Sequence, residues 1–320
     1  MVSIIVSSHK EDLFLQFSKN VQQTIGDIPY EIIQINNPGL IGICQAYNIG
    51  ARKAKYTYII FSHEDILFHA DQWGITVRKI FEQDSSIGLV GCIGGYYKSL
   101  QHTGWAIDKK YISSYMIGTH CGTSYLNKTY NGNSRSILLN DNMEIPNDFK
   151  EKELTNESVL MLDGMFLITK KCIHEKFPFD EKTFKGFHCY DLDYSFQLRK
   201  YYKIVVNHNI LIEHFSSGNF DQSWLKEMKI FNHKWKDELP VALYQYTDSQ
   251  KIRLEFTCFE IILRIYKNNK LSYSNIFKQL FYINYINKVG LINWLIILFK
   301  IIKKFTNLAF KYGYHNVVSA

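Results

Sequence analysis

Three short strings of the sequence hold the side chains best suited to chemistry. The first is Ser62-His63-Glu64-Asp65, which directly follows the apolar run 59–61. A carboxylate at the end of a buried strand can hold a hard divalent cation whose remaining positions go to phosphate oxygens. Taken alone, the string is equally typical of a solvated turn after a strand, so the other two strings decide between these interpretations.

The second string is Tyr190-Asp191-Leu192-Asp193, at the start of a helix predicted over 190–201. Carboxylates in the first turn of a helix can satisfy free backbone N–H groups, which is a purely structural role. One of them can instead act as a general base that takes a proton from a bound hydroxyl. Because Asp191 and Asp193 are two residues apart, they point in different directions, so one can face a crevice while the other braces the fold.

The third string is Glu213-His214, which ends the apolar run 210–212 and precedes a small, flexible turn at 216–218. A single histidine at the end of a strand is more often structural than functional. Beside a carboxylate that can bind a metal it becomes a candidate ligand, because neutral imidazole is a common metal ligand.

Apolar runs alternate with helical patterns in the first hundred residues. Strands are expected at 2–6, 31–35 and 58–61, with helices at 14–24 and 43–54 between them. This alternation predicts an α/β fold with a parallel sheet. Each strand ends in a polar cluster, and the carboxyl ends of parallel strands meet at one crevice, where ligands of such sheets bind.

Further strands are expected at 87–92, at 159–169 with a break at Asp163-Gly164, and as a strand pair or bent strand over 203–213, followed by a closing helix at 220–235. Residues 96–157, rich in Tyr, Ser, Asn and Gly, are expected to form an irregular insertion with some short strands over the crevice. We therefore divide the chain into a catalytic domain at 1–235 and a C-terminal helical region at 236–320.

The net charge of +7 comes from one part of the chain. Residues 1–260 hold 28 Lys and Arg against 30 Asp and Glu, whereas 261–320 hold nine Lys and Arg and no acid. A helix at 289–311 would place Asn293, Lys300, Lys304, Asn307 and Lys311 on one face, with apolar residues largely elsewhere. This pattern predicts a helix that lies on an anionic membrane surface. The alternative is a helix packed on the catalytic domain or on a partner subunit, including a second copy.

The cysteines and the N-terminus indicate the compartment. Six scattered cysteines contain no C-x-x-C pair, so a zinc site or a disulfide framework is not expected. The first residues lack the basic start and long apolar stretch of a secretory signal. We expect a cytoplasmic protein that is peripheral on the inner face of the cytoplasmic membrane.

The order of these motifs resembles the family 2 glycosyltransferases of the GT-A fold. An Ala-x-Asn-x-Gly helix at 46–50 lies between the first polar strand ends and the acidic string, and Asp-Gly and an acidic helix start follow. Within that family, the strings 61–69, 187–193 and 213–218 resemble a bacterial subgroup that carries His-x-Asp in place of Asp-x-Asp. The resemblance covers about residues 1–235 and implies a GT-A domain with a basic, amphipathic helical tail.

Carried over by position, the resemblance implies a site for a nucleotide sugar, with UDP as the expected nucleotide. The residues implied for donor binding are Ser7, Ser8, His9, Asn36, Asn37, Asn48, His63, Glu64 and Asp65. Those implied on the acceptor side are Asp163, Gly164, Tyr190 and Asp193. Asp65 and His214 are implied to hold Mn²⁺ or Mg²⁺, and Asp191 to be the catalytic base.

The implied reaction is a metal-dependent transfer that inverts the anomeric carbon. It moves a sugar to a glycan or a lipid-linked saccharide in bacterial surface polysaccharide synthesis. Two other classes of protein stay open. His63 and Tyr190 stand at positions where the family carries acids. This difference is compatible with a non-catalytic partner subunit that binds nucleotide sugars. The basic, aromatic tail is compatible, more weakly, with a nucleic-acid-binding protein, and nucleic acid is not our expected partner.

Overall fold

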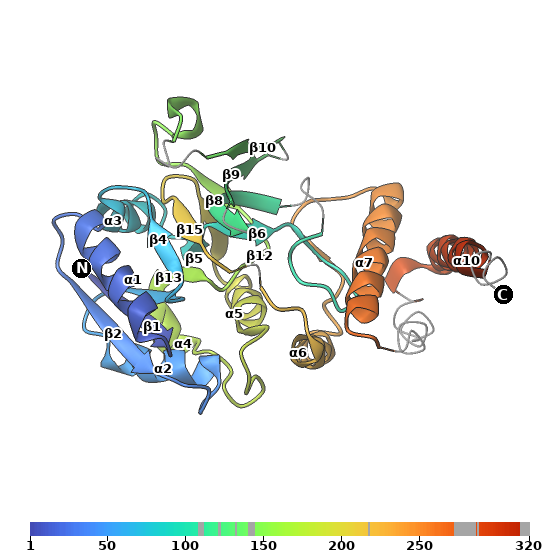
Figure 1. Cartoon of the computed structure of the whole chain (residues 1–320), viewed down its shortest axis with the longest axis horizontal. Coiled ribbons are helices and arrows are strands. Elements are labelled where there is room, and N and C mark those ends of the chain that lie inside the picture. Colours follow the sequence, from blue (N-terminus) through green and yellow to red (C-terminus); the bar gives the residue numbers. More distant parts are fainter. Residues whose placement is uncertain are drawn as a thin grey trace.

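The computed structural model describes residues 1–107, 112–120, 123–131, 133–139, 145–216, 218–271, 286 and 288–313, the side chains of 118–120, 123 and 304–313 excepted. Its N-terminal part is built on a seven-stranded sheet in the order β11-β14-β5-β13-β3-β1-β2 (Figure 1). The parallel centre expected from the sequence is present, because β1 (Val2–Ser8) pairs in parallel with β2 (Tyr30–Asn36) and β3 (Tyr58–Ser62).

The other four strands make the sheet mixed. Strand β13 (Phe166–Lys170) runs antiparallel to both β3 and β5 (Ile87–Gly91). Strand β14 (Lys203–Asn207) is parallel to β5, and β11 (Asn156–Ser158) is antiparallel to β14 at the edge. The helices beside the sheet are α1 (Glu11–Thr24), α2 (Ile43–Lys53), α3 (Trp73–Gln83), α4 (Lys171–Lys176) and α5 (Tyr190–Leu198).

Both faces of this sheet are buried, because successive side chains of a strand point to opposite faces. On β1, Ile5 packs into a core with residues of α2 and α5, whereas Ile4 and Val6 pack into a second core with residues of α1 and α3. Gly50 allows α2 to approach closely, since a Cβ there would lie 2.2 Å from Ile5 Cγ2. The α/β class predicted from the sequence is confirmed.

A second sheet lies above the carboxyl edge of the first and contains much of segment 96–157. Its order is β10-β9-β8-β15-β4, and β6 pairs with both β8 and β12. The bounds are β4 (Ile66–Phe68), β6 (Ile93–Gly95), β8 (Ile112–His120), β9 (Thr123–Tyr130), β10 (Asn133–Leu138), β12 (Met161–Leu162) and β15 (Ile212–His214). Three short elements, β7 (Tyr97–Lys98), β16 (Val241–Ala242) and the 3-10 helix η2 (Asn147–Phe149), complete this part.

The expectation of an irregular insertion with some short strands over 96–157 was wrong for the described residues of 112–138. Strands β8, β9 and β10 form a regular antiparallel meander, in which Met116 faces Asn127 and Ser136 also faces Asn127. The predicted strand pair at 203–213 also needs correction, because β14 belongs to the large sheet and β15 to the second. The chain therefore changes sheets at 208–211, which carries His214 to the same edge as Asp65 through the pairing of β15 with β4.

Three helices follow, α6 (Gln222–Lys234), α7 (Asp248–Asn268) and α10 (Leu291–Gly313). Helix α7 begins with a capping box between Thr247 and Gln250, which satisfies two free N–H groups. Its buried residues Phe259 and Ile262 belong to the same core as Ile5. The predicted division at residue 235 therefore does not separate two hydrophobic cores. Within the described residues, no helix has the length and apolar content needed to cross a membrane.

Helix α10 is apolar on two sides. Trp294, Ile297 and Ile301 are buried in the core that includes residues of α7. Among the side chains of 291–303, six other large apolar ones are exposed: Leu291, Ile292, Leu295, Ile296, Phe299 and Ile302. The sequence pattern predicted one apolar and one polar face, whereas the structure divides the apolar residues between the core and the surface. We call the six exposed residues the α10 outer face.

Candidate active site

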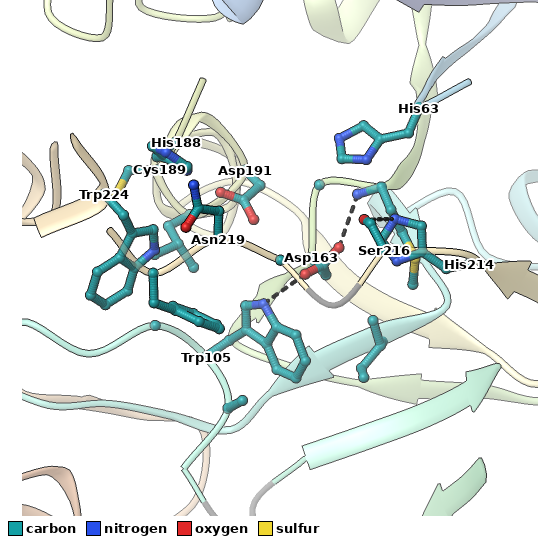
Figure 2. A pocket seen from close by; sticks show the side chains of 18 of the residues that line it. His63, Trp105, Asp163, His188, Cys189, Asp191, His214, Ser216, Asn219 and Trp224 are labelled. Carbon is teal, nitrogen blue, oxygen red and sulfur yellow. Dashed lines mark hydrogen bonds between the residues drawn. The ribbon is translucent and has the colours of Figure 1, made fainter. Parts of the chain in front are cut away.

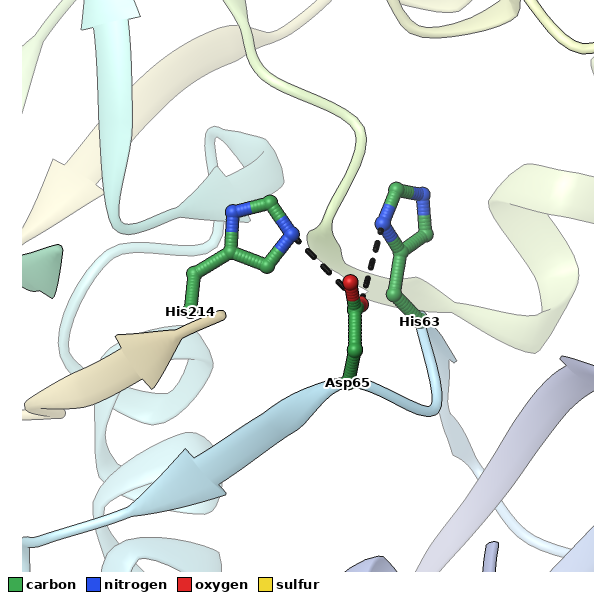
Figure 3. A group of neighbouring side chains, drawn as sticks. All are labelled: His63, Asp65 and His214. Atoms are coloured by element: carbon green, nitrogen blue, oxygen red, sulfur yellow. Dashed lines mark ion pairs between the residues drawn. The ribbon is translucent and has the colours of Figure 1, made fainter. Parts of the chain in front are cut away.

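A group of two imidazoles and one carboxylate lies where β3 and β15 end at the sheet edge (Figure 3). His63 and Asp65 follow β3, and His214 is the last residue of β15. His63 Nδ1 lies 3.7 Å and His214 Nε2 lies 3.5 Å from Asp65 Oδ1. One ligand atom from each residue lies within 4.8 Å of the others. The sequence predicted Asp65 and His214 as metal ligands, and the structure adds His63 to them.

The charges of this cluster support one another. Burial by itself raises the pKa of Asp65, but the hydrogen bond from His214 and the charges of His63 and His214 hold that pKa far below its usual value. Burial lowers the pKa of His214, yet the hydrogen bond and charge of Asp65 raise it overall. For His63 burial prevails and the pKa falls, although Asp65 acts in the opposite direction. The carboxylate is thus ionised and His63 is held neutral, as metal ligands need to be, whereas His214 holds its proton more tightly and must release it to bind a metal.

Tyr190 holds the ring of His63. Its hydroxyl shares a hydrogen bond of 2.8 Å with His63 Nε2, which leaves Nδ1 directed at Asp65. Gly164 makes room for this phenol, because a Cβ at that position would lie 2.2 Å from Tyr190 Oη. Both residues were predicted on the acceptor side. Tyr190 also orients His63, since a hydrogen bond to one ring nitrogen of a histidine fixes the direction in which the other nitrogen can bind a metal.

Asp191 lies in the first turn of α5, beside the metal-ligand cluster. Cys189, the residue before the first residue of α5, adopts the left-handed conformation with φ of 59°, which is uncommon for a residue other than glycine. Burial raises the pKa of Asp191 to about 7, and the like charge of Asp163 adds to this, while backbone hydrogen bonds from Leu192 and Gly164 oppose it. A carboxylate with a pKa in this range is well matched to proton transfer near neutral pH.

Asp163 is fixed from two sides in the same cavity (Figure 2). Trp105 Nε1 donates a hydrogen bond of 3.0 Å to Oδ2, and the Met165 backbone N–H donates one of 3.0 Å to Oδ1. A carboxylate held by two donors is positioned rather than free to rotate. Asp163 therefore lines the same cavity as Asp191, and its assignment to the acceptor side stays a prediction.

The cavity has a volume of about 910 Å³ and runs from the metal-ligand cluster to helices α6 and α7. His63 and His214 line one end, Asp163 and Asp191 the middle, and Trp224 and Arg264 the other end. Its size is at the upper end of the range for small-molecule sites. The carboxylate of Asp65 and the two imidazoles can bind a divalent cation. The neighbouring carboxylate of Asp191, whose pKa is raised, can accept a proton from a bound hydroxyl.

Of the residues predicted for the donor, His63 lines this cavity, whereas Ser7, Ser8, His9, Asn36, Asn37 and Glu64 lie at the same sheet edge and are not among its lining residues. Glu64 is buried and accepts hydrogen bonds from the backbone N–H groups of His9 and Lys10. Asn37 closes a turn by donating to Ile41 O. The other members are Ser7 and Ser8 at the end of β1, with Ser8 buried, and the exposed His9 and Asn36. Glu64 and Asn37 therefore shape the loops of this edge, and His9 and Asn36 are the members most open to a ligand.

Two other predicted site residues have buried protein partners. Asn48 is buried on α2, where its amide donates hydrogen bonds of 2.9 Å to Phe179 O and 2.8 Å to Glu181 Oε2 and so ties α2 to the chain before α5. Asp193 is 1% exposed and accepts hydrogen bonds from Trp235 Nε1 and Gln197 Nε2, with Lys234 Nζ 2.8 Å away. Its carboxylate is thus directed at the end of α6 and does not line the cavity.

Two parts of the cavity were not found from the sequence. One is Trp105, since no sequence pattern indicated that its indole would reach Asp163. The cavity-facing residues of α7, including Arg264, lie in the region that we had assigned to membrane binding. Their spacing of three and four residues does indicate one helix face, but it gives no sign of what that face meets.

Comparison with known proteins gives the class of the protein. The chain belongs to the family described as "Glycosyltransferase like family", whose model matches residues 3–246. That match includes both carboxylates of the cavity and the whole metal-ligand cluster. No curated protein matches the sequence significantly.

Solved structures with a similar fold are distant. The chain is similar to GalNAc-T7, crystallised with UDP, GalNAc and Mn²⁺, at 12% identity and a TM-score of 0.47, and the match covers 74% of this chain. This chain spans about half of that protein, since 49% of GalNAc-T7 is covered. A second similar structure, A197 from STIV, has 15% identity and a TM-score of 0.36, with 68% of this chain and 85% of that one covered.

Proposed function

We propose that this glycosyltransferase is a metal-dependent, inverting enzyme of the GT-A type, close to family 2 and its His-x-Asp subgroup. It moves a sugar from a nucleoside-diphosphate sugar, with UDP as the expected nucleotide, to a glycan or lipid-linked saccharide acceptor. The observation that carries this proposal is that Asp191 faces the same cavity as His63 and His214 of the metal-ligand cluster. We assign the reaction to bacterial surface polysaccharide synthesis.

The ligand set of the cluster supports Mn²⁺ over Mg²⁺. Mg²⁺ prefers an all-oxygen octahedral shell, whereas imidazole ligands suit transition metals. His63, Asp65 and His214 together supply two nitrogens and a carboxylate oxygen within 4.8 Å of one another, so they fit a single ion. A bound divalent cation would neutralise charge on the departing diphosphate. The residues of the chain then hold the donor in place, with His9 and Asn36 as the open groups on the nucleotide side.

Asp191 is the general base of the proposed reaction. Its carboxylate takes the proton of the acceptor hydroxyl while that oxygen attacks the anomeric carbon and the bond to the diphosphate breaks. Attack from the face opposite the leaving group inverts the anomeric configuration. Asp163, held by Trp105 and Met165, keeps the proton affinity of Asp191 high and is placed to contact the acceptor.

The α10 outer face supports the proposed location at the inner face of the cytoplasmic membrane. Large apolar side chains gathered on one exposed face usually mark an interaction surface. Lys300 and Lys303 are exposed beside Ile296 and Phe299, and residues 261–320 contain no acid. A basic helix with an exposed apolar side fits an anionic bilayer surface. Pairing of two copies through the same face would give a homo-oligomer, which the lipid test in the Discussion separates from lipid binding.

The test of the proposed function is a panel of nucleotide sugars with Mn²⁺ or Mg²⁺, read out by release of the nucleoside diphosphate. We expect one UDP-sugar to turn over, faster with Mn²⁺, and Asp191→Asn to reduce kcat by about 100-fold to 10,000-fold. Asp12→Asn, which changes an exposed carboxylate on α1, is the matched control and should keep full activity.

The anomeric configuration of the product, followed by NMR during turnover, tests inversion separately. Full transfer activity in Asp191→Asn would remove Asp191 as the base. If the wild type binds UDP but turns over no donor, the protein is instead a nucleotide-sugar-binding partner subunit.

A further inference from the structure

The far wall of the cavity is built by two helices outside the region that carries the catalytic strings. Ile261, Arg264, Ile265 and Asn268 line the cavity from α7. Their spacing of three, four and seven residues places them on one side of the helix. The opposite side, with Phe259, Ile262, Leu263 and Tyr266, is buried in the core. Helix α7 is therefore anchored on one face and presents a fixed second face to the cavity.

An aromatic pair from the α6 segment continues this wall. Phe220 and Trp224 line the cavity, and their rings meet edge to face at 5.2 Å. The amide of Asn269, at the end of α7, donates a hydrogen bond of 2.8 Å to Phe220 O and so joins the two segments. Figure 2 shows Trp224 on the side of the cavity away from His63 and His214. Aromatic rings with nearby amide and aliphatic groups are well suited to the mixed apolar and polar surface of a sugar.

Arg264 gives this wall a permanent positive charge. Among the described residues that line the cavity it is the one Lys or Arg, and its side chain is exposed. No described carboxylate lies within ion-pair distance of it, so Asp163 and Asp191 do not neutralise it. A guanidinium presents paired N–H donors that match the two oxygens of a carboxylate or phosphate. The guanidinium of Arg264 can therefore donate paired hydrogen bonds to an oxyanion bound at this wall.

We propose that Phe220, Trp224, Ile261, Arg264, Ile265 and Asn268 form an acceptor subsite for an anionic saccharide. The aromatic pair and the isoleucines cover the apolar face of the sugar, and Arg264 binds its carboxylate or phosphate. This inference rests on the proposed function in one respect, namely that the cavity receives the acceptor. It goes beyond that function by proposing that the acceptor carries a negative charge and that α7 supplies the residue that binds this charge.

The test is a titration of the full-length protein with three small probes, followed by tryptophan fluorescence. The probes are methyl glucoside, methyl glucuronide and methyl glucoside 6-phosphate, which differ in carrying no charge, a carboxylate or a phosphate. We expect at least one charged probe to bind about tenfold tighter than the neutral one, because a charge-assisted hydrogen bond supplies that difference. The stronger of the two charged probes then identifies the oxyanion.

Arg264→Gln should reduce that preference to about one, while Arg253→Gln should leave it unchanged. Arg253 is an exposed residue of the same helix, three turns earlier and on nearly the same side, but it does not line the cavity. The subsite is disproved if the charged probes bind the wild type no better than methyl glucoside. It is also disproved if Arg264→Gln keeps the preference.

Calorimetry with UDP separates this inference from the proposed function. We expect UDP to bind the wild type and Arg264→Gln equally. Weaker UDP binding in Arg264→Gln would assign the arginine to the donor and overturn the acceptor subsite. Absence of UDP binding in the wild type would count against the proposed function, while the probe titration would still decide on the α6 and α7 wall.

Discussion

The carboxyl edge of the large sheet and helix α10 carry charge in opposite ways. In the metal-ligand cluster at the sheet edge the ionisable side chains are buried or half-buried and have defined partners, as Asp65 has in His63 and His214. On α10, Lys300 and Lys303 are exposed, and exposed apolar side chains lie beside them. A buried charge requires a specific partner or a shifted pKa, whereas an exposed charge acts through its surface as a whole. We therefore expect a single substitution at the sheet edge to have a large effect. On α10 the effect of each substitution should be small, because many side chains share the surface.

The largest effect is expected at the metal-ligand cluster. Asp65→Ala removes the carboxylate that both imidazoles face, so we expect affinity for Mn²⁺ to fall by more than about 100-fold, with a similar loss of turnover. Calorimetry with MnCl₂ in the presence of UDP measures the first and nucleotide release the second. Asp71→Ala, an exposed carboxylate outside the cluster, is the control. Unchanged Mn²⁺ affinity in Asp65→Ala would show that the three residues form a structural group only.

Asp191 and Asp193 allow the same comparison within one helix turn. Burial raises the pKa of Asp193 too, but its carboxylate also holds Lys234, Trp235 and Gln197 together. Asp193→Asn removes the charge that Lys234 faces, so we expect the free energy of unfolding to fall by about 2 kcal/mol. Asp191→Asn should not destabilise the fold. The pKa of Asp191 is raised in the folded protein, so its ionisation costs stability as the pH rises above its unfolded value, and Asn removes that cost. Urea unfolding at pH 8 measures both. A larger loss for Asp191→Asn than for Asp193→Asn would reverse the two roles.

Much of this edge could be predicted because its signals are local. Apolar runs of strand length fixed β1, β2 and β3 to within two residues, and the ends of parallel strands must meet at one edge. That rule is sufficient to bring Asp65 near the other polar strand ends. His63 was assigned to the donor instead of the metal, because the tyrosine that turns its ring comes from a helix 127 residues away.

The remaining differences depend on contacts between distant segments. Strands β8 to β10 have few large apolar residues and many Ser, Asn and Thr, so their pattern is weak until β15 pairs with β8. Asn48 resembled a ligand-binding residue, yet the chain at 179–181 takes up its amide. On α10, the sequence could not tell which apolar residues would be covered, because that depends on the angle at which α10 meets α7.

The pH dependence of turnover tests whether Asp191 works as an isolated base. Below its pKa of about 7 the carboxylate is protonated, so kcat should fall about tenfold per pH unit on the acid side and level off above neutrality. Asp163→Asn removes the like charge that raises this pKa, so the acid limb should move to lower pH. A profile measured from pH 5.5 to 8.5 decides this. An acid limb that moves to higher pH in Asp163→Asn would contradict the coupling of the two carboxylates.

The smallest effect per residue is expected on the α10 outer face, because each side chain contributes only part of a shared surface. Leu295→Glu with Phe299→Glu should reduce binding to vesicles containing phosphatidylglycerol by about tenfold, measured by co-sedimentation. Leu40→Glu changes an even more exposed apolar residue, which lies in a loop far from α10 in the sequence, and should have no effect. Binding of the wild type should weaken in high salt, since Lys300 and Lys303 attract the anionic lipid.

Two other outcomes would contradict membrane binding. If the wild type does not bind vesicles and is a dimer that the double variant converts to a monomer, the α10 outer face pairs with a second copy. A wild type that binds oligonucleotides but not vesicles would make nucleic acid the partner of the basic helix.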